Sequence, residues 1–339
     1  MKGKTDSQPL VSVITPFYNT EQYLSECIES VLRQSYGNFE YILLNNCSTD
    51  RSLEIAEKYA KQDRRIRLIN NSEFLNQVGN YNRALRMISP QSKYCKIVQA
   101  DDWIYPECLE KMVSVAEENP SVGIVSGYYL RGKEIGNVGL PYSTRILPGR
   151  DICRKTLLEG GFFFGNPTSI LVRADIVRER NPFYAEGRLH EDTEACYEIL
   201  RDKDFGFVHQ VLSFMRVDNV SISSAVRNLD PNDLDLFIVL NEHGPYFLTE
   251  AEFRERLKAV MKIYFTSLAK KGFLKMDKRY WAYHEKGLRT VGYCLRRRDL
   301  IPYVLIIGVD VLLNPKMAVE RLLRSYKRRK KTEMKENYE

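Results

Sequence analysis

The sequence predicts an α/β fold, in which a mainly parallel β-sheet is covered by helices on both faces and is followed by a helical C-terminal region. Two observations support this fold class. Short apolar runs rich in β-branched and aromatic residues alternate with amphipathic helical segments over residues 10–130. Residues 226–299 then read as mostly helical.

The first strand and helix set the pattern for those that follow. Residues 10–16 are a short β-rich run, and residues 21–34 place their apolar side chains on one stripe at helical spacing. Strands are further expected at 39–44, 65–70, 94–100 and 122–130, and helices at 51–62, 79–88 and 106–119. Ligands bind such sheets beyond the carboxyl ends of the strands, near a switch in strand order. We therefore expect the site among PFYN, NNCSTD and Asp-Asp, which follow three of these strands.

The positive charge of the chain belongs to its tail. The 339 residues are 44% hydrophobic and 28% charged, as in an ordinary soluble globular protein, and they carry a net charge of +7. Residues 316–335 hold nine Lys/Arg and two Glu, a surplus that equals the net charge of the whole chain. No DNA- or RNA-binding motif accompanies this surplus, so nucleic acid is not an expected partner.

Cysteine and histidine usage favours a cytoplasmic protein without zinc. The seven cysteines are scattered and nowhere spaced as CxxC, and MKGKTDSQPL does not read as a secretory signal peptide. The four histidines form no HExxH or other ligand pair. We expect reduced thiols and no zinc site.

Two adjacent acids follow the apolar run at 94–100. Asp101 and Asp102 repel each other, and keeping both charged at a strand end is unfavourable unless a cation or a hydrogen-bonding ligand offsets the repulsion. An alternative is that the pair only caps the helix that opens at Pro106, although one cap would suffice. The pair therefore predicts a bound ligand.

The ordered motifs of the first two thirds of the chain resemble those of a known family. VSVITPFYN, NNCSTDRS, QADDWIYPECLEKMV, GNPTSILVR, HEDTEACYEIL and LSFMR occur in the order and approximate spacing of glycosyltransferase family 2. These are inverting enzymes with the Rossmann-like GT-A fold, and related members build bacterial surface polysaccharide. The resemblance covers residues 10–225 and implies a nucleotide half at about 10–105 and an acceptor half at about 106–225. Around it lie an N-terminal arm at 1–9, the helical region at 226–299 and an apolar plus basic tail at 300–339.

The resemblance gives the acid pair a role in holding the donor. Asp101 and Asp102 match the family's metal and nucleotide acids, which implies a divalent cofactor, Mn²⁺ or Mg²⁺, bridging a nucleotide diphosphate. Asp101 is expected at the ribose or the metal, and Asp102 at the metal. Asp218 falls near the place where some members supply a His as a further metal ligand. Gln99 departs from the family, which often carries an acid there.

The expected nucleotide-binding residues come from the loops after the first two strands and from the third helix. Thr15, Pro16 and Tyr18 match the loop after the first strand. Asn45 stands where the family usually has Asp; a carboxylate accepts the N3–H of uracil or thymine, whereas an amide can accept that bond and donate another. Arg83 lies near the family's basic residue for the base or phosphate, with a solvated helix arginine as the alternative.

A second acid pair is expected to act on the acceptor. Inversion needs a base that takes the proton of an acceptor hydroxyl opposite the leaving diphosphate. Glu191 and Asp192 match the family's acidic pair, with Asp192 as the base and Glu191 supporting it. The alternative is that both acids only stabilise the first turn of a helix. His190 is left outside the catalytic set.

The resemblance predicts an inverting, metal-assisted glycosyltransferase that moves a sugar from a UDP- or dTDP-linked donor to a hydroxyl of a saccharide or lipid-linked acceptor. One alternative is a sugar nucleotidyltransferase, which normally needs a Gly-rich basic loop that PFYNTEQY lacks. The other is a non-catalytic nucleotide-sugar binding or membrane-scaffolding protein, which Asn45, Gln99 and the tail motivate.

The tail leaves two interpretations open. Residues 300–313 are apolar but shorter than the roughly 20 residues of a spanning helix. Basic residues flank this segment at 296–298 and 321–331, as in an element that lies on a membrane surface. A core helix followed by a solvated basic tail is the alternative. The expected location is the cytoplasm. If the tail is a membrane-surface element, the protein is also expected to associate peripherally with the inner face of the cell membrane.

Overall fold

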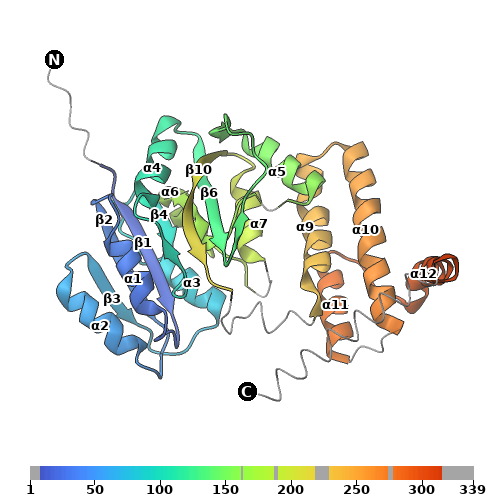
Figure 1. Ribbon diagram of the computed structural model, residues 1–339, viewed down its shortest axis with the longest axis horizontal. Coiled ribbons are helices and arrows are strands. Elements are labelled where there is room, and N and C mark those ends of the chain that lie inside the picture. Colours follow the sequence, from blue (N-terminus) through green and yellow to red (C-terminus); the bar gives the residue numbers. More distant parts are fainter. Residues whose placement is uncertain (1–7, 162, 187–189, 218–228, 274–277, 315–339) are drawn as a thin grey trace. The chain divides into compact units, whose positions relative to one another are not determined.

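The computed structural model describes residues 8–161, 163–186, 190–217, 229–273 and 278–314 (Figure 1). The chain forms two compact units. The first comprises residues 1–224 with 246–248, and the second comprises residues 225–245 with 249–339. The first unit carries the sheet and the second is helical.

A ten-stranded sheet organises the described part of the first unit, with the order β3-β2-β1-β4-β9-β6-β10-β5 and with β7 beside β6 and β8 beside β10. The neighbours β3, β2, β1 and β4 are parallel, and β6 is parallel to β10. Between them β9 runs antiparallel to both β4 and β6. The strands are β1 (Val11–Phe17), β2 (Phe39–Asn45), β3 (Ile66–Asn70), β4 (Tyr94–Ile97), β5 (Trp103–Ile104), β6 (Val122–Arg131), β7 (Glu134–Gly136), β8 (Ile146–Leu147), β9 (Ile170–Arg173) and β10 (Asp204–Met215).

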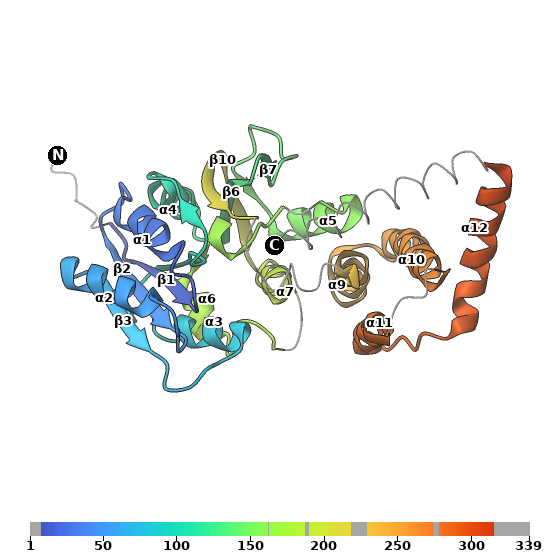
Figure 2. The same ribbon diagram turned by 60° about the horizontal axis from the view of Figure 1, so that its bottom comes forward.

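Helices cover both faces of this sheet, as the sequence predicts (Figure 2). Apolar residues of α1 and α4 share one core with Val13 and Leu43. Ile14 and Ile42 alternate with these residues and point to the opposite face, where α3 and α6 lie. The helices of this unit are α1 (Leu24–Leu32), α2 (Ser52–Gln62), α3 (Gln77–Leu85), α4 (Cys108–Glu118), α5 (Gly149–Glu159), α6 (Ala174–Glu179) and α7 (Glu191–Ile199), with a 3-10 turn, η1, at Pro167–Ser169.

Several expected elements have different bounds in the structure; the helix expected at 21–34, for example, is Leu24–Leu32. Two of the differences have a clear local cause. The strand expected at 94–100 ends at Ile97, because the chain turns at Gln99, whose carbonyl accepts the backbone N–H of Asp102 at 2.9 Å. The helix expected at 79–88 begins at Gln77, because the side chain of Asn76 accepts the backbone N–H of Gly79 at 2.7 Å and caps it.

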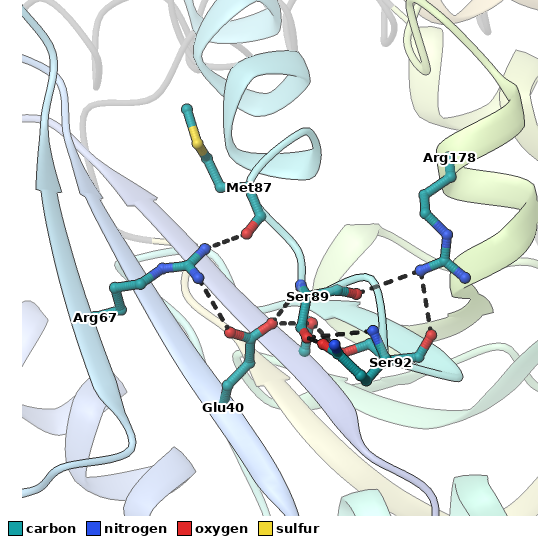
Figure 3. A network of polar contacts seen from close by, with 8 residues as sticks. Glu40, Arg67, Met87, Ser89, Ser92 and Arg178 are labelled. Atoms are coloured by element: carbon teal, nitrogen blue, oxygen red, sulfur yellow. Dashed lines mark hydrogen bonds and ion pairs between the residues drawn. The ribbon is translucent and has the colours of Figure 1, made fainter.

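A polar network closes the end of the sheet at which β1 and β2 begin (Figure 3). Glu40 Oε1 accepts the hydroxyl of Ser12 at 2.5 Å and the backbone N–H of Ser89 at 2.6 Å, and Arg67 lies 3.5 Å from the other carboxylate oxygen. Arg178, a residue of α6, donates a hydrogen bond to the carbonyl of Ser89 at 3.4 Å. These bonds fix the connection between α3 and β4 on the sheet, at the end away from the carboxyl ends of the strands.

The second unit confirms the expected helical region. Its helices are α9 (Pro231–Phe247), α10 (Glu250–Phe273), α11 (Lys278–Thr290) and α12 (Ile301–Leu313), with a 3-10 turn at Arg297–Leu300. In its core, His284 Nδ1 is hydrogen-bonded to the Tyr264 hydroxyl, and His284 Nε2 is hydrogen-bonded to the carbonyl of Leu229, both at 2.9 Å. Burial lowers the pKa of His284 to about 4, so the ring is neutral near pH 7. None of the helices in the described ranges is both long and apolar enough to cross a membrane.

Candidate active site

The carboxyl ends of β1, β2 and β3 lie side by side, since Phe17 pairs with Asn45 and Asn45 pairs with Asn70. β4 runs parallel to β1 on its other side, and Asp101 and Asp102 follow it. The structure therefore brings the segments PFYN, NNCSTD and the first acid pair, Asp101 and Asp102, to one edge of the sheet, where the sequence predicts the site.

Asp102 is held in a buried cradle. Its side chain is 3% exposed. Thr168 in η1 donates its hydroxyl to Oδ2 at 2.7 Å, and the backbone N–H of Arg216 donates to Oδ1 at 3.1 Å. The guanidinium of Arg216 also donates to the carbonyl of Asp101 at 3.1 Å and pairs with Glu26 on α1. Asp101 itself is half-buried. The pair thus combines one fixed carboxylate with a more accessible one.

The first acid pair fits a divalent cation. Burial, followed by the charge of Asp101, raises the pKa of Asp102 to about 7. A nearby cation would relieve this repulsion, and one or two carboxylates completed by substrate phosphates are the usual protein ligands of Mg²⁺. Within the described residues no group of three or more His, Cys, Asp or Glu side chains is placed to hold a metal. Asp218, the further ligand suggested by the sequence, lies outside the described residues.

A buried lysine, Lys96, stabilises the segment that carries Thr168. Lys96 on β4 is fully buried, and its ammonium donates to the carbonyls of Thr168 at 2.7 Å and Ile170 at 3.2 Å. Burial lowers its pKa. These bonds hold η1 and the start of β9 against β4, which places the Thr168 hydroxyl on Asp102. Sequence reasoning gave Lys96, Thr168 and Arg216 no role, although a lysine inside the apolar run YCKIVQ is a signal that could have drawn attention.

Gln99 links the first acid pair to α3 without adding charge. Its side-chain amide donates to the hydroxyl of Tyr81 at 3.1 Å, and its backbone N–H donates to Thr168 Oγ1 at 3.1 Å. Tyr81 is buried, and its pKa is raised by burial and by the charges of Asp101 and Asp102. The departure from the family therefore places a neutral amide where an acid would have added a third negative charge.

The loop after β1 offers one exposed aromatic residue. Thr15 and Pro16 are buried in β1, and the Thr15 hydroxyl donates to the carbonyl of Val98 at 2.8 Å inside the sheet. Tyr18 is 43% exposed and meets the ring of Phe74 edge-on, with centroids 4.9 Å apart. Of these three predicted nucleotide contacts, Tyr18 alone presents a side chain to solvent.

Asn45 uses part of its amide within its own loop. It is buried at the end of β2, where its Oδ1 accepts the backbone N–H of Ser48 at 3.0 Å and its Nδ2 donates to Asn70 at 3.1 Å. One acceptor lone pair and one N–H remain available to a ligand. Arg83 on α3 is half-buried, and its side chain forms no ion pair or hydrogen bond with another part of the chain that the structure describes.

The second acid pair, Glu191 and Asp192, opens α7. Both side chains are half-buried, and Asp192 Oδ1 accepts the backbone N–H of Thr193 at 2.7 Å. Burial raises the pKa of Asp192, whereas neighbouring His190 lowers it. Burial, with a smaller contribution from Asp192, raises the pKa of Glu191 to about 7. Carboxylates with raised pKa values are suited to accept a proton near neutral pH.

Comparison with known proteins gives consistent matches. A family model described as Glycosyl transferase family 2 matches residues 12–180. An uncharacterized glycosyltransferase of Haemophilus influenzae is 31% identical over 275 residues, which cover 80% of this chain and all of that protein. A second one from the same organism is 35% identical over 176 residues, 50% of this chain and 54% of that protein. The Bacillus subtilis relative EpsE is 38% identical over 244 residues, 66% of this chain and 84% of that protein.

Solved structures share the fold. TarS residues 1–349 from S. aureus, in complex with UDP-GlcNAc, superpose with a TM-score of 0.59 at 18% identity, over 83% of this chain and 80% of that one. The mannosyltransferase PcManGT from Pyrobaculum calidifontis, in complex with GDP-Man and Mn²⁺, gives a TM-score of 0.52 at 15% identity, over 91% and 88%. These likenesses confirm the expected GT-A fold.

Proposed function

The chain belongs to glycosyltransferase family 2 and is a glycosyltransferase. We propose that it transfers a sugar, with inversion of configuration, from a UDP- or dTDP-linked donor to a hydroxyl of a saccharide or lipid-linked acceptor. The observation that carries the proposal is the presence of two acid pairs in one unit, one buried in a cradle at the sheet edge and one half-buried at the start of α7. They suit the two demands of the reaction, which are to hold a diphosphate and to remove a proton.

The first acid pair holds the donor diphosphate together with Mn²⁺ or Mg²⁺. Both oxygens of Asp102 already accept hydrogen bonds, so the more accessible Asp101 is the principal ligand and Asp102 completes it. Asp218 remains proposed as a further ligand. When bound, the cation neutralises charge on the departing diphosphate. Thr168 and Arg216 keep the pair in position.

Asp192 takes the proton of the acceptor hydroxyl. The acceptor oxygen then forms a bond to the anomeric carbon of the sugar, while the bond from that carbon to the diphosphate oxygen breaks on the opposite face. The nucleoside diphosphate leaves with the bonding electron pair, and the configuration at this carbon inverts. Glu191 supports the base through its adjacent charge and contacts to the acceptor.

The nucleotide base is read beside the first acid pair. Tyr18 offers an exposed ring for stacking, and the free lone pair and N–H of Asn45 suit the N3–H and a ring carbonyl of uracil or thymine. Thr15 and Pro16 frame this position through the backbone of β1, and Arg83 supplies a cation for the base or phosphate. TarS carries UDP-GlcNAc on a related fold.

Thermal unfolding of the purified protein with UDP, dTDP or GDP, each with and without Mn²⁺, tests this proposal. A ligand that binds only the folded state raises the melting temperature by mass action, so UDP or dTDP should do so, and more strongly with Mn²⁺. A response to GDP alone contradicts the pyrimidine preference, and no response to any of the three contradicts the proposal. Release of pyrophosphate from a nucleoside triphosphate and a sugar phosphate would point to a nucleotidyltransferase instead.

A membrane-surface role for the tail is proposed on a separate observation. Several apolar residues of α12 are at least half exposed, among them Leu305, Ile306 and Leu312, the last at 80%. The basic residues 321–331 that follow lie outside the described residues. An apolar helix beside basic residues suits a lipid surface with anionic headgroups, which would make the protein peripheral at the inner face of the cell membrane. Full-length protein should float with anionic liposomes and protein lacking residues 300–339 should not; equal flotation contradicts the proposal.

A further inference from the structure

Phe74 is an exposed aromatic residue in the loop that follows β3. It is 59% exposed, although the residues before it, Asn71, Ser72 and Glu73, are polar. Its ring meets that of Tyr18 edge-on, with centroids 4.9 Å apart and planes inclined by 63°, and Tyr18 is itself 43% exposed. Single exposed apolar residues are common on protein surfaces. Two exposed rings in contact, which we call the aromatic pair, instead form an accessible apolar corner.

Both loops that carry the aromatic pair are bonded to the loop after β2. Leu75 follows the phenylalanine, and Asn46 bonds it twice: its Oδ1 accepts the backbone N–H of Leu75 at 3.0 Å and its Nδ2 donates to the carbonyl at 2.8 Å. Asn19 follows the tyrosine, and its Oδ1 accepts the backbone N–H of Thr49 at 2.8 Å. The segments beside both rings are therefore fixed before a ligand binds, which lowers the entropic cost of binding.

The aromatic pair lies at the same edge of the sheet as Asn45. The carbonyl of Asn45 accepts the backbone N–H of Asn71, which opens the loop after β3, at 2.9 Å. Phe17 pairs with Asn45 across β1 and β2, and Tyr18 follows Phe17. The amide proposed to read the base is thus bonded to one of the two loops and paired with the strand that leads into the other.

We propose that Phe74 is a second aromatic contact for the nucleobase of the donor, beside Tyr18. The inference rests on the function proposed above. A base that stacks on one ring of an edge-on pair meets the other ring at its side, so both rings remove apolar surface from water. Aromatic side chains accept any base, because every base has a π-face. Phe74 therefore adds affinity for the base, while Asn45 supplies the choice between bases.

Binding to Phe74→Ala tests the inference. Calorimetry in Mn²⁺ with the wild type first selects the tightest of UDP, dTDP and GDP. For the variant, the Kd of this nucleotide should rise about five- to tenfold, the lower end of the loss for a removed base–aromatic contact. The Kd of inorganic pyrophosphate, which has no base, should stay within about twofold of the wild type when measured by displacement of the nucleotide. Phe74→Tyr keeps a ring and should bind the nucleotide like the wild type.

The melting temperature separates a binding role from a structural one. Phe74 is mostly exposed, so the melting temperature of ligand-free Phe74→Ala should equal that of the wild type. Tyr142→Ala is the matched control, because Tyr142 is an exposed aromatic residue between β7 and β8 whose ring contacts only that of His209 among the described residues. It should leave both dissociation constants unchanged.

Three results overturn the inference while the proposed function stands. They are unchanged nucleotide binding by Phe74→Ala, equal weakening of nucleotide and pyrophosphate, and weakened nucleotide binding by Phe74→Tyr. If the wild type binds none of the three nucleotides, the proposed function falls and the inference falls with it.

Discussion

The two acid pairs are alike in sequence and differ in their surroundings. Each consists of two adjacent carboxylates, and in each burial raises at least one pKa to about 7. Asp102 is fixed by donors from two distant segments, η1 and the residue after β10. Within the described residues, the carboxylate of Asp192 accepts hydrogen bonds only from Thr193, the next residue of α7.

This difference suits the first acid pair to binding the donor and the second acid pair to proton transfer. A carboxylate whose oxygens are already bonded keeps its place and is well suited to organise a ligand. A carboxylate at a helix start, with fewer bonds to break, can accept a proton and orient toward an acceptor. We infer that the first acid pair determines donor affinity and the second determines the rate of transfer.

The largest effect should come from removing the base. Asp192→Asn keeps the shape of the side chain but takes up no proton, so transfer should fall about 10²- to 10⁴-fold, measured as nucleoside diphosphate released in the presence of acceptor. Glu198→Gln is the control on the same helix, because Glu198 pairs with Arg180 at the surface; it should retain transfer. Full activity of Asp192→Asn would remove the base assignment.

Loss of the cradle should weaken donor binding. Thr168→Val removes the hydroxyl on Asp102, so Mn²⁺-dependent affinity for UDP should fall about tenfold and stability should drop by about 1–3 kcal/mol, measured by calorimetry and denaturant unfolding. Thr156→Val removes a buried hydroxyl that bonds only within α5. This control should lose stability and keep UDP affinity; if both variants bind UDP alike, the cradle has no role in binding.

The pH profile should report the second acid pair. A protonated carboxyl accepts no proton, and burial raises the pKa of Asp192, so the transfer rate should fall about tenfold per pH unit below that raised pKa and level off above it. Glu191→Gln removes one of two charges that disfavour each other, which should shift the profile to lower pH. Glu198→Gln should keep the wild-type profile, and a flat profile in all three proteins would contradict a carboxylate base.

The smallest effect should follow Gln99→Glu. A third carboxylate beside Asp101 and Asp102 should destabilise the metal-free protein by roughly 1 kcal/mol, and Mn²⁺ should restore the loss. Gln34→Glu serves as control, because Gln34 is buried and, like Gln99, hydrogen-bonded, but it lies between α1 and α4. Its loss of stability should be independent of Mn²⁺. The same independence in Gln99→Glu would place residue 99 outside the reach of the metal.

Much of the parallel half of the sheet could be predicted from sequence, because local periodicity determines β1 to β4 and the helices between them. The cradle could not, because Thr168 and Arg216 reach Asp102 only after β9 inserts antiparallel between β4 and β6. The two acid pairs could be predicted, because the acids of each pair are adjacent in the sequence and match the motifs of the family.

The central claim is that the two acid pairs divide donor binding from transfer. Calorimetric titration of UDP in Mn²⁺ into the wild type, Asp101→Asn and Asp192→Asn tests it most directly. We expect Asp101→Asn to weaken UDP binding at least about tenfold and Asp192→Asn to bind within about twofold of the wild type. Normal binding by Asp101→Asn, or an equal loss in Asp192→Asn, would contradict this division of roles.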